Sequence, residues 1–314
     1  MNQRGFAEAG GPPAVELEGV TKRFGSHVAV DDLSLTVPAG SVYGFIGPNG
    51  SGKTTTLRMI MNIFYPNRGA IRVFGQTLDG TCTDRIGYLP EERGLYRKMK
   101  VRELLRFYGE LKGGRNVDRA VDEWLERLDL ASWGEKKVEA LSKGMSQKVQ
   151  FIATVVADPD LIILDEPFSG LDPVNADAMR DAVLELQRRG RTVVFSTHDM
   201  AVAEKMCDFI FMIFRGRKVL DGTLDSIQAT YGNDTLRVRT PGGGDGFREL
   251  PGVESVTDYG QLQELRVSRE ADPQALVREI MDRGPVYGFE VAKPSLHDIF
   301  VRIAGPAARE VTHA

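Results

Sequence analysis

The chain has 314 residues, of which 42% are hydrophobic and 27% are charged, and its formal net charge is −4. These values fit a soluble globular protein of about two domains, and a mildly acidic chain has no general attraction for nucleic acid or anionic lipid. Cys82 and Cys207 lie far apart and outside any C-x-x-C or Cys/His pattern, which argues against a disulfide framework or a zinc site and fits a reducing compartment. No apolar run approaches the roughly 18 residues that cross a bilayer, and residues 1–14 lack the apolar core of a signal peptide. We therefore expect no nucleic-acid partner, and any membrane span should come from another chain.

The first part of the chain predicts a tail followed by β-structure. Residues 1–13 read as a flexible tail rich in Gly, Pro and Ala, and apolar residues alternate with polar ones from Val15 to Val37, which predicts an antiparallel β lobe. A buried strand is expected over 42–46, a helix over 54–64 and a short strand over 70–74.

The middle of the chain predicts a helical subdomain inserted in an α/β core. Apolar residues recur at three- and four-residue intervals over 101–131, as on the buried face of a helix. Apolar runs at 161–164 and 193–195 flank a helical stretch, 174–189, which is the βαβ rhythm of a parallel sheet covered on both faces.

A second, small α+β domain is predicted over 224–305, with 306–314 as a tail. Its expected strands cover 236–239, 262–267 and 286–291, and its expected helices cover 272–282 and 296–304.

The segment Gly47 to Thr54 matches G-x-x-x-x-G-K-[ST] between the strand 42–46 and a helix. Glycine lets backbone N–H groups turn toward an anion, and a helix N-terminus adds a partial positive charge. Lys53 supplies a full positive charge. The segment therefore predicts a phosphate cradle for a triphosphate, although a Gly-rich turn before a helix could match the same pattern.

Two carboxylates, Asp165 and Glu166, follow the strand 161–164. The carboxyl ends of parallel strands face the ligand crevice, so both side chains are expected beside the phosphate loop. Asp165 is placed to hold Mg²⁺, and Glu166 to orient or deprotonate an attacking water. The alternative is a charged strand end that Pro167 terminates.

Two further positions complete the pattern. Ser142 precedes a helical stretch over 146–157, where it is either a helix cap or, with Gly144, a second anion site. His198 follows the strand 193–195, so its side chain should again point toward the crevice.

In these motifs and their order, residues 15–223 resemble the ATP-binding subunit of an ATP-binding cassette (ABC) transporter. The resemblance implies a P-loop NTPase core of ABC ATPase type over 14–223, with the β lobe and a helical subdomain at about 95–158. By this resemblance Phe24 stacks on adenine, and the phosphate loop consists of Gly47, Pro48, Asn49, Gly50, Ser51, Gly52, Lys53, Thr54 and Thr55, with Thr54 on Mg²⁺. The glutamine loop corresponds to 88–91, the signature to 141–145, the second nucleotide motif to 161–166, the dimer-contacting loop to 169–172, and the switch histidine to His198.

The family implies an ATPase that works as a head-to-tail dimer of two copies or of homologous subunits. ATP lies between one copy's phosphate loop and the other's Ser142 and Gly144, His198 contacts the γ-phosphate, and Asp172 couples the two sites. Hydrolysis then reopens the dimer and drives a separate transmembrane permease, so the chain is expected in the cytoplasm, on the inner face of the cell membrane. The segment 294–300 and the domain before it resemble the C-terminal extension of sodium-extrusion and drug-resistance exporters.

This sequence departs from the family pattern at three positions. Glu91 replaces the usual glutamine and brings a charge that Mg²⁺ should attract. In the signature, Lys143 replaces glycine and Met145 replaces glutamine. We expect nucleotide binding across the dimer to survive, with Lys143 adding attraction.

Other classes of protein share parts of these motifs. A soluble ABC ATPase acting on ribosomes or DNA is the main alternative, but such proteins usually carry two cassettes or a long coiled coil, which this chain lacks. A phosphate-loop kinase or GTPase would not need residues 142–145.

Overall fold

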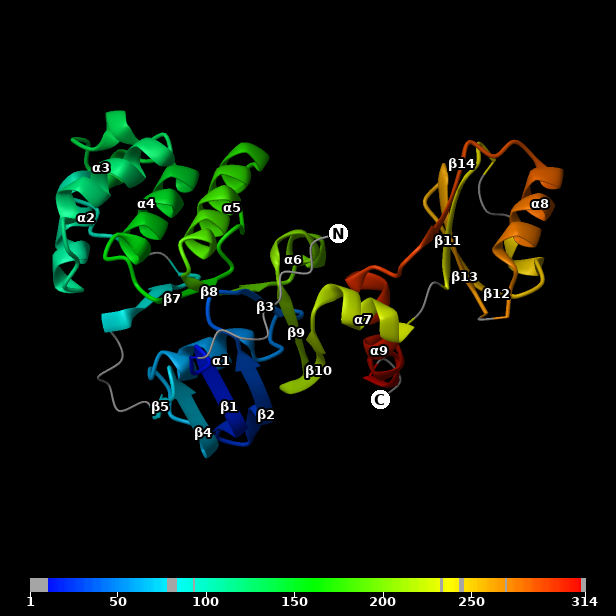
Figure 1. The fold of residues 1–314 in the computed structure, drawn as a ribbon, viewed down its shortest axis with the longest axis horizontal. Helices are drawn as coiled ribbons and strands as arrows, with labels where there is room; N and C mark the ends of the chain where they lie inside the picture. Colours follow the sequence, from blue (N-terminus) through cyan, green and yellow to red (C-terminus); the bar gives the residue numbers. More distant parts are fainter. Residues whose placement is uncertain are drawn as a thin grey trace. The chain divides into compact units, whose positions relative to one another are not determined.

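The computed structural model describes residues 11–77, 84–92, 94–231, 234–242, 246–268 and 270–311. The chain forms two compact units, Met1–Thr223 and Leu224–Ala314 (Figure 1). Cys82 and residues 1–10 of the predicted tail lie outside the described residues, whereas Cys207 is described and has a free thiol.

An antiparallel sheet opens the first unit. Its strand order is β2-β1-β4-β5, with β1 Val15–Phe24, β2 His27–Val37, β4 Arg68–Val73 and β5 Gln76–Thr77. The alternating side chains Val15, Leu17 and Val20 are buried, as are their counterparts on β2. The predicted antiparallel β lobe is therefore confirmed.

The second sheet of this unit has the order β10-β9-β3-β8-β7-β6. Its strands are β3 Val42–Ile46, β6 Ile86–Leu89, β7 Leu161–Asp165, β8 Thr192–Thr197, β9 Phe209–Phe214 and β10 Arg217–Gly222. All neighbouring pairs are parallel except β9 and β10. The carboxyl ends of β3, β7 and β8 therefore meet at one edge, where α/β proteins bind ligands.

Both faces of the parallel sheet are buried, and side-chain alternation divides them. Leu161 and Ile163 face a core shared with helix α1 (Lys53–Ile60) and the antiparallel sheet. Ile162 and Leu164 face a second core built from four helices, α2 Val101–Leu111, α3 Val117–Arg127, α4 Lys143–Val155 and α5 Pro173–Arg188. Helix α6 (Met200–Met206) connects β8 to β9.

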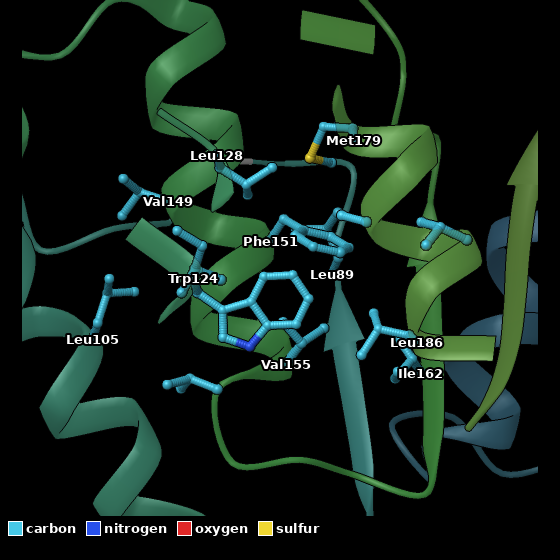
Figure 2. Close-up of a cluster of buried hydrophobic side chains, with 14 of the residues drawn as sticks. Leu89, Leu105, Trp124, Leu128, Val149, Phe151, Val155, Ile162, Met179 and Leu186 are labelled. Atoms are coloured by element: carbon cyan, nitrogen blue, oxygen red, sulfur yellow. The ribbon is translucent and has the colours of Figure 1, made fainter. Parts of the chain in front are cut away.

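Helices α2, α3 and α4 lie together and form the helical subdomain (Figure 1). Their buried side chains belong to the second core. Within it the rings of Trp124 on α3 and Phe151 on α4 meet edge to face at 5.8 Å (Figure 2). This pair fixes α3 against α4. Short 3-10 turns at Ala131–Trp133 and Val138–Ala140 lead into α4.

Several helix boundaries differ from the expected ones. The segment with the predicted helical pattern, 101–131, contains two helices, since Gly113 and Asn116 between them adopt left-handed backbone angles. Helix α4 begins at Lys143, earlier than 146, because Ser142 caps it. Helix α1 ends at Ile60 instead of 64. Among the described helices, none is long and apolar enough to cross a membrane.

The second unit is a four-stranded antiparallel sheet of order β12-β13-β11-β14 with three helices. The strands are β11 Thr235–Arg239, β12 Val253–Asp258, β13 Leu262–Val267 and β14 Gly288–Ala292, and the helices are α7 Leu224–Tyr231, α8 Pro273–Arg283 and α9 Leu296–Val311, with a 3-10 turn at Phe247–Glu249. Leu236, Leu265 and Ile280 lie in its core. Helix α9 continues past the predicted end at 304, so the expectation of a tail from 306 is wrong for 306–311: Gly305 and Pro306, both helix breakers, do not end it.

Candidate functional site

The loop between β3 and α1 requires glycine for steric reasons. A Cβ at Gly47 would lie 2.2 Å from the carbonyl oxygen of Ile213, and one at Gly52 would lie 2.6 Å from that of Ala29. Gly52 also has a φ of +109°, which side-chain-bearing residues avoid. Helix α1 starts directly after it, so the loop brings backbone N–H groups and a helix N-terminus to one place.

Lys53 folds back over this loop. Its Nζ donates hydrogen bonds to the carbonyl oxygens of Gly47 at 2.7 Å and Pro48 at 3.2 Å, and it lies 3.7 Å from Oε1 of Glu166. The side chain is only 6% exposed. Burial lowers the pKa of Lys53, while the carboxylates of Glu166 and Asp165 oppose that shift. The ammonium is thus held in a site where added negative charge is favourable.

Asp165 ends β7 and is buried beside the loop. Its Oδ1 accepts hydrogen bonds from Ser196 Oγ at 2.5 Å and from Thr54 Oγ1 at 3.2 Å. Its Oδ2 is buried and has no hydrogen-bond partner within the described part of the chain. An unpartnered carboxylate oxygen next to a hydroxyl suits a hard divalent cation such as Mg²⁺, so the donors fit the expected metal.

Glu166 follows with a φ of +50°, an uncommon backbone angle for a residue with a side chain. Its N–H donates to Ser196 Oγ at 3.0 Å. Both carboxylate oxygens lie 3.1 Å from Nδ1 of His198. The Glu166 side chain is 9% exposed and the His198 imidazole is 56% exposed. The carboxylate is therefore buried, and its histidine partner is accessible from the surface.

One pocket gathers Phe24 and most residues of the phosphate loop. It is lined by Phe24, His27, Ala29, Asn49, Gly50, Gly52, Lys53, Thr54, Thr55, Glu91 and Glu166. Phe24 is 43% exposed, its ring packs edge to face on Phe64, and Lys22 Nζ lies 5.1 Å from its centroid. Gly47, Pro48 and Ser51 do not line the pocket; the first two hold Lys53 through their carbonyls.

The predicted signature lies outside that pocket. Ser142 caps α4 by accepting a hydrogen bond from Met145 N at 3.3 Å, and neither it nor Gly144 is among the residues that line the phosphate-loop pocket. Lys143 lines a neighbouring pocket with Glu91 and Glu166. One chain therefore brings the phosphate loop, both carboxylates and His198 together, and Ser142 and Gly144 line neither of these two pockets.

Asp172, the predicted dimer-contacting residue, is exposed and caps α5. Its Oδ1 accepts a hydrogen bond from the backbone N of Asn175 at 3.0 Å, and this bond lowers the pKa of the Asp172 carboxyl.

Two residues of the site were not predicted. Ser196 contacts both carboxylate residues, and Gln147 on α4 donates to the backbone carbonyl of Pro167, next to Glu166. The available signal for Ser196 was a hydroxyl two residues before His198, at the end of a strand adjacent to β7. Gln147 lies one turn into α4. In the sequence, only the start of this helix pointed to the site.

A glycine loop on a parallel sheet, with a buried lysine, two carboxylates and a histidine at the same edge, defines a P-loop ATPase. A family model described as "ABC transporter" matches residues 30–169, and one described as "ATP-binding protein DrrA1-3-like, C-terminal domain" matches residues 222–304. The chain belongs to the ABC transporter ATP-binding proteins, and its activity is ATP hydrolysis.

Relatives match over nearly the whole chain. The ABC transporter ATP-binding protein YhaQ of Bacillus subtilis (strain 168) is 39% identical over 294 residues, covering 92% of this chain and 98% of YhaQ. The Nod factor export ATP-binding protein I of Burkholderia lata is 33% identical over 299 residues, covering 93% and 97%. Among solved structures, an ATP-binding subunit of an ABC transporter aligns with a TM-score of 0.66 and 32% identity, covering 70% of this chain and 93% of that one.

Proposed function

We propose that this chain is the ATP-hydrolysing subunit of a transporter, that it powers a separate membrane permease, and that it acts as a head-to-tail dimer. The observation that carries the proposal is the convergence of Lys53, Asp165, Glu166 and His198 at one sheet edge, while Ser142 does not line the adjacent phosphate-loop pocket. Half of an ATP site is present in each copy, and a second copy supplies the rest.

Within one copy, the loop and Lys53 bind the phosphates of ATP. Lys53 exchanges its carbonyl contacts for phosphate oxygens, and Phe24 presents an exposed ring to the adenine. Thr54 and Asp165, which are hydrogen-bonded to each other, would hold Mg²⁺. Glu91 lines the same pocket as Thr54, where its charge would attract the cation. The metal neutralises charge on the β- and γ-phosphates when bound.

Glu166 accepts the proton of the attacking water. The carboxylate has His198 on its exposed side and Lys53 on its buried side, which fixes its orientation. His198, more than half exposed, reaches the γ-phosphate from the same position. Acid–base catalysis of this kind contributes roughly 100- to 10,000-fold to a rate.

The second copy closes the site with the start of its α4. That helix presents Ser142, Gly144 and the neighbouring Lys143 and Met145 at a helix N-terminus, which favours anions. Lys143 adds a full positive charge where the family carries glycine. Asp172, exposed at the start of α5, lies in the loop that would couple the two sites.

The proposed direction of transport is export, and the proposed location is the inner face of the cell membrane. The match of residues 222–304 to a DrrA-like C-terminal domain and the relative named for Nod factor export support this direction. A transmembrane partner would carry the cargo.

The proposal is tested with Glu166→Gln in the full chain, measured by light scattering with Mg²⁺ and ATP. The variant should bind ATP, hydrolyse it very slowly and accumulate as a dimer, because the γ-phosphate that both copies hold is no longer removed. Glu123→Gln, which alters an exposed carboxylate paired with Arg119, should behave as wild type. Adding Lys53→Ala to Glu166→Gln should abolish the dimer. A monomeric Glu166→Gln with bound ATP would contradict the head-to-tail arrangement.

A further inference from the structure

Ser196 forms hydrogen bonds with both carboxylate residues of the site. Strand β8 runs parallel to β7, and Ser196 is paired in register with Asp165. Its side chain is fully buried. Side chains at paired positions of neighbouring parallel strands point to the same face, so the hydroxyl is directed at Asp165 by the fold itself.

The chemistry of the two partners fixes the direction of both hydrogen bonds. A carboxylate can only accept, so Ser196 Oγ donates its single proton to Asp165 Oδ1 at 2.5 Å. A backbone N–H can only donate, so the N–H of Glu166 donates a hydrogen bond to the same Oγ, at an N–O distance of 3.0 Å. The Ser196 hydroxyl therefore bridges Asp165 and Glu166, and its two hydrogen bonds fix its orientation.

At Asp165 this bridge distinguishes the two carboxylate oxygens. Oδ1 accepts hydrogen bonds from both Ser196 and Thr54, whereas Oδ2 has no hydrogen-bond partner in the ranges that the structure describes. The carboxylate is thus oriented with one oxygen occupied and one available to a cation.

At Glu166 the bridge supports an unfavourable backbone. A φ of +50° is costly for a residue with a Cβ, and such an angle persists only when its surroundings hold it. The N–H of that same residue is bound by Ser196, while the side chain is directed toward Lys53 and His198. Loss of the hydroxyl would let the Glu166 backbone relax and move the carboxylate.

The geometry points to Ser196 as a positioning residue that sets the metal-binding oxygen of Asp165 and the carboxylate of Glu166 through one hydroxyl group. This inference rests on the proposed roles of Asp165 and Glu166. It predicts that Ser196 affects turnover and Mg²⁺-dependent binding together, and leaves metal-free ATP binding unchanged.

The test measures steady-state hydrolysis and direct ATP titration of the full chain, with Mg²⁺ or with EDTA. Ser196→Ala should lower kcat roughly 10- to 100-fold and raise the KM for Mg²⁺-ATP, as expected for a lost hydrogen bond to a charged group. ATP affinity in EDTA should equal that of wild type, and the gain in affinity on adding Mg²⁺ should shrink. Ser196→Thr, which keeps the hydroxyl and suits a strand, should recover most of both.

Ser41→Ala is the matched control. Ser41 is also fully buried and donates one hydrogen bond, to the Pro38 carbonyl at 2.7 Å, but it precedes β3 at the opposite end of the sheet. It should change stability without changing kcat or the Mg²⁺ effect. If Ser196→Ala folds poorly, Ser196→Cys keeps a weak donor in place and should give an intermediate kcat.

Normal kcat and a normal Mg²⁺ effect in Ser196→Ala would overturn the inference, and so would a Ser196→Thr variant as impaired as Ser196→Ala. Glu166→Gln, measured in parallel, separates the two proposals. Normal turnover in Glu166→Gln would remove the base from the proposed function, and the Mg²⁺ titration would still decide whether Ser196 acts on Asp165.

Discussion

The imidazole of His198 stands against the carboxylate of Glu166, with Nδ1 3.1 Å from both carboxylate oxygens. The two residues directly follow the neighbouring parallel strands β7 and β8, so the sheet brings them to the same edge. His198→Ala should reduce kcat roughly 100-fold or more while ATP binding persists, because the carboxylate loses its exposed partner and, in the proposed site, the γ-phosphate would lose a contact. His297→Ala, in the second unit, is the control and should retain full turnover. Equal kcat in His198→Ala and wild type would refute this role.

The pH dependence of stability should report the buried charge of Lys53. Burial lowers the Lys53 pKa below its ordinary 10.5. Between the lowered value and 10.5 the unfolded chain binds a proton that the folded chain does not, so this group's contribution to stability rises with pH across that window. In urea unfolding without nucleotide, the free energy of unfolding of wild type minus that of Lys53→Met should therefore increase from neutral pH toward 10.5. A difference that stays constant with pH would show that the Lys53 pKa is not lowered.

Gly47 should not accept a side chain. A Cβ there would approach the Ile213 carbonyl to 2.2 Å, so Gly47→Ala must displace the phosphate loop or β9. We expect a loss of about 1–3 kcal/mol in the free energy of unfolding and a large loss of ATP affinity. Gly190→Ala is the comparison, because its φ of +82° disfavours a side chain but no atom lies within 4 Å of the added Cβ. It should reduce stability and leave ATP affinity unchanged; the same affinity loss in both variants would argue against a local effect.

The helical subdomain should depend on its aromatic pair. Phe151 is fully buried against Trp124 and lies in the core that α2, α3, α4 and α5 share (Figure 2). Phe151→Ala should cost about 3–5 kcal/mol in urea unfolding, as buried Phe truncations do. Phe107→Ala, at a 41% exposed site, should cost far less. Similar losses in the two variants would mean that the subdomain core contributes little to stability.

Sequence reasoning predicted the parts of the site that follow from strand order and failed where side-chain geometry decides. Lys53, Asp165, Glu166 and His198 each follow or precede a predictable strand, and parallel strands end at one edge, so their meeting could be expected. The bridging role of Ser196 could not, because it depends on the register of β7 against β8 and on an unusual φ at Glu166. The break between α2 and α3 and the continuation of α9 through Pro306 likewise depend on backbone angles that local propensity does not fix.

In the proposed dimer, a complete ATP site needs the phosphate loop of one copy and the signature of another. This requirement can be tested by mixing two inactive variants of the full chain, Lys53→Ala and Ser142→Arg. In a mixed dimer, one site combines both defects and the other combines an intact loop with an intact signature. The proposed arrangement predicts that Mg²⁺-dependent ATP hydrolysis returns in the mixture and not in either variant alone. A mixture as inactive as its components would contradict it.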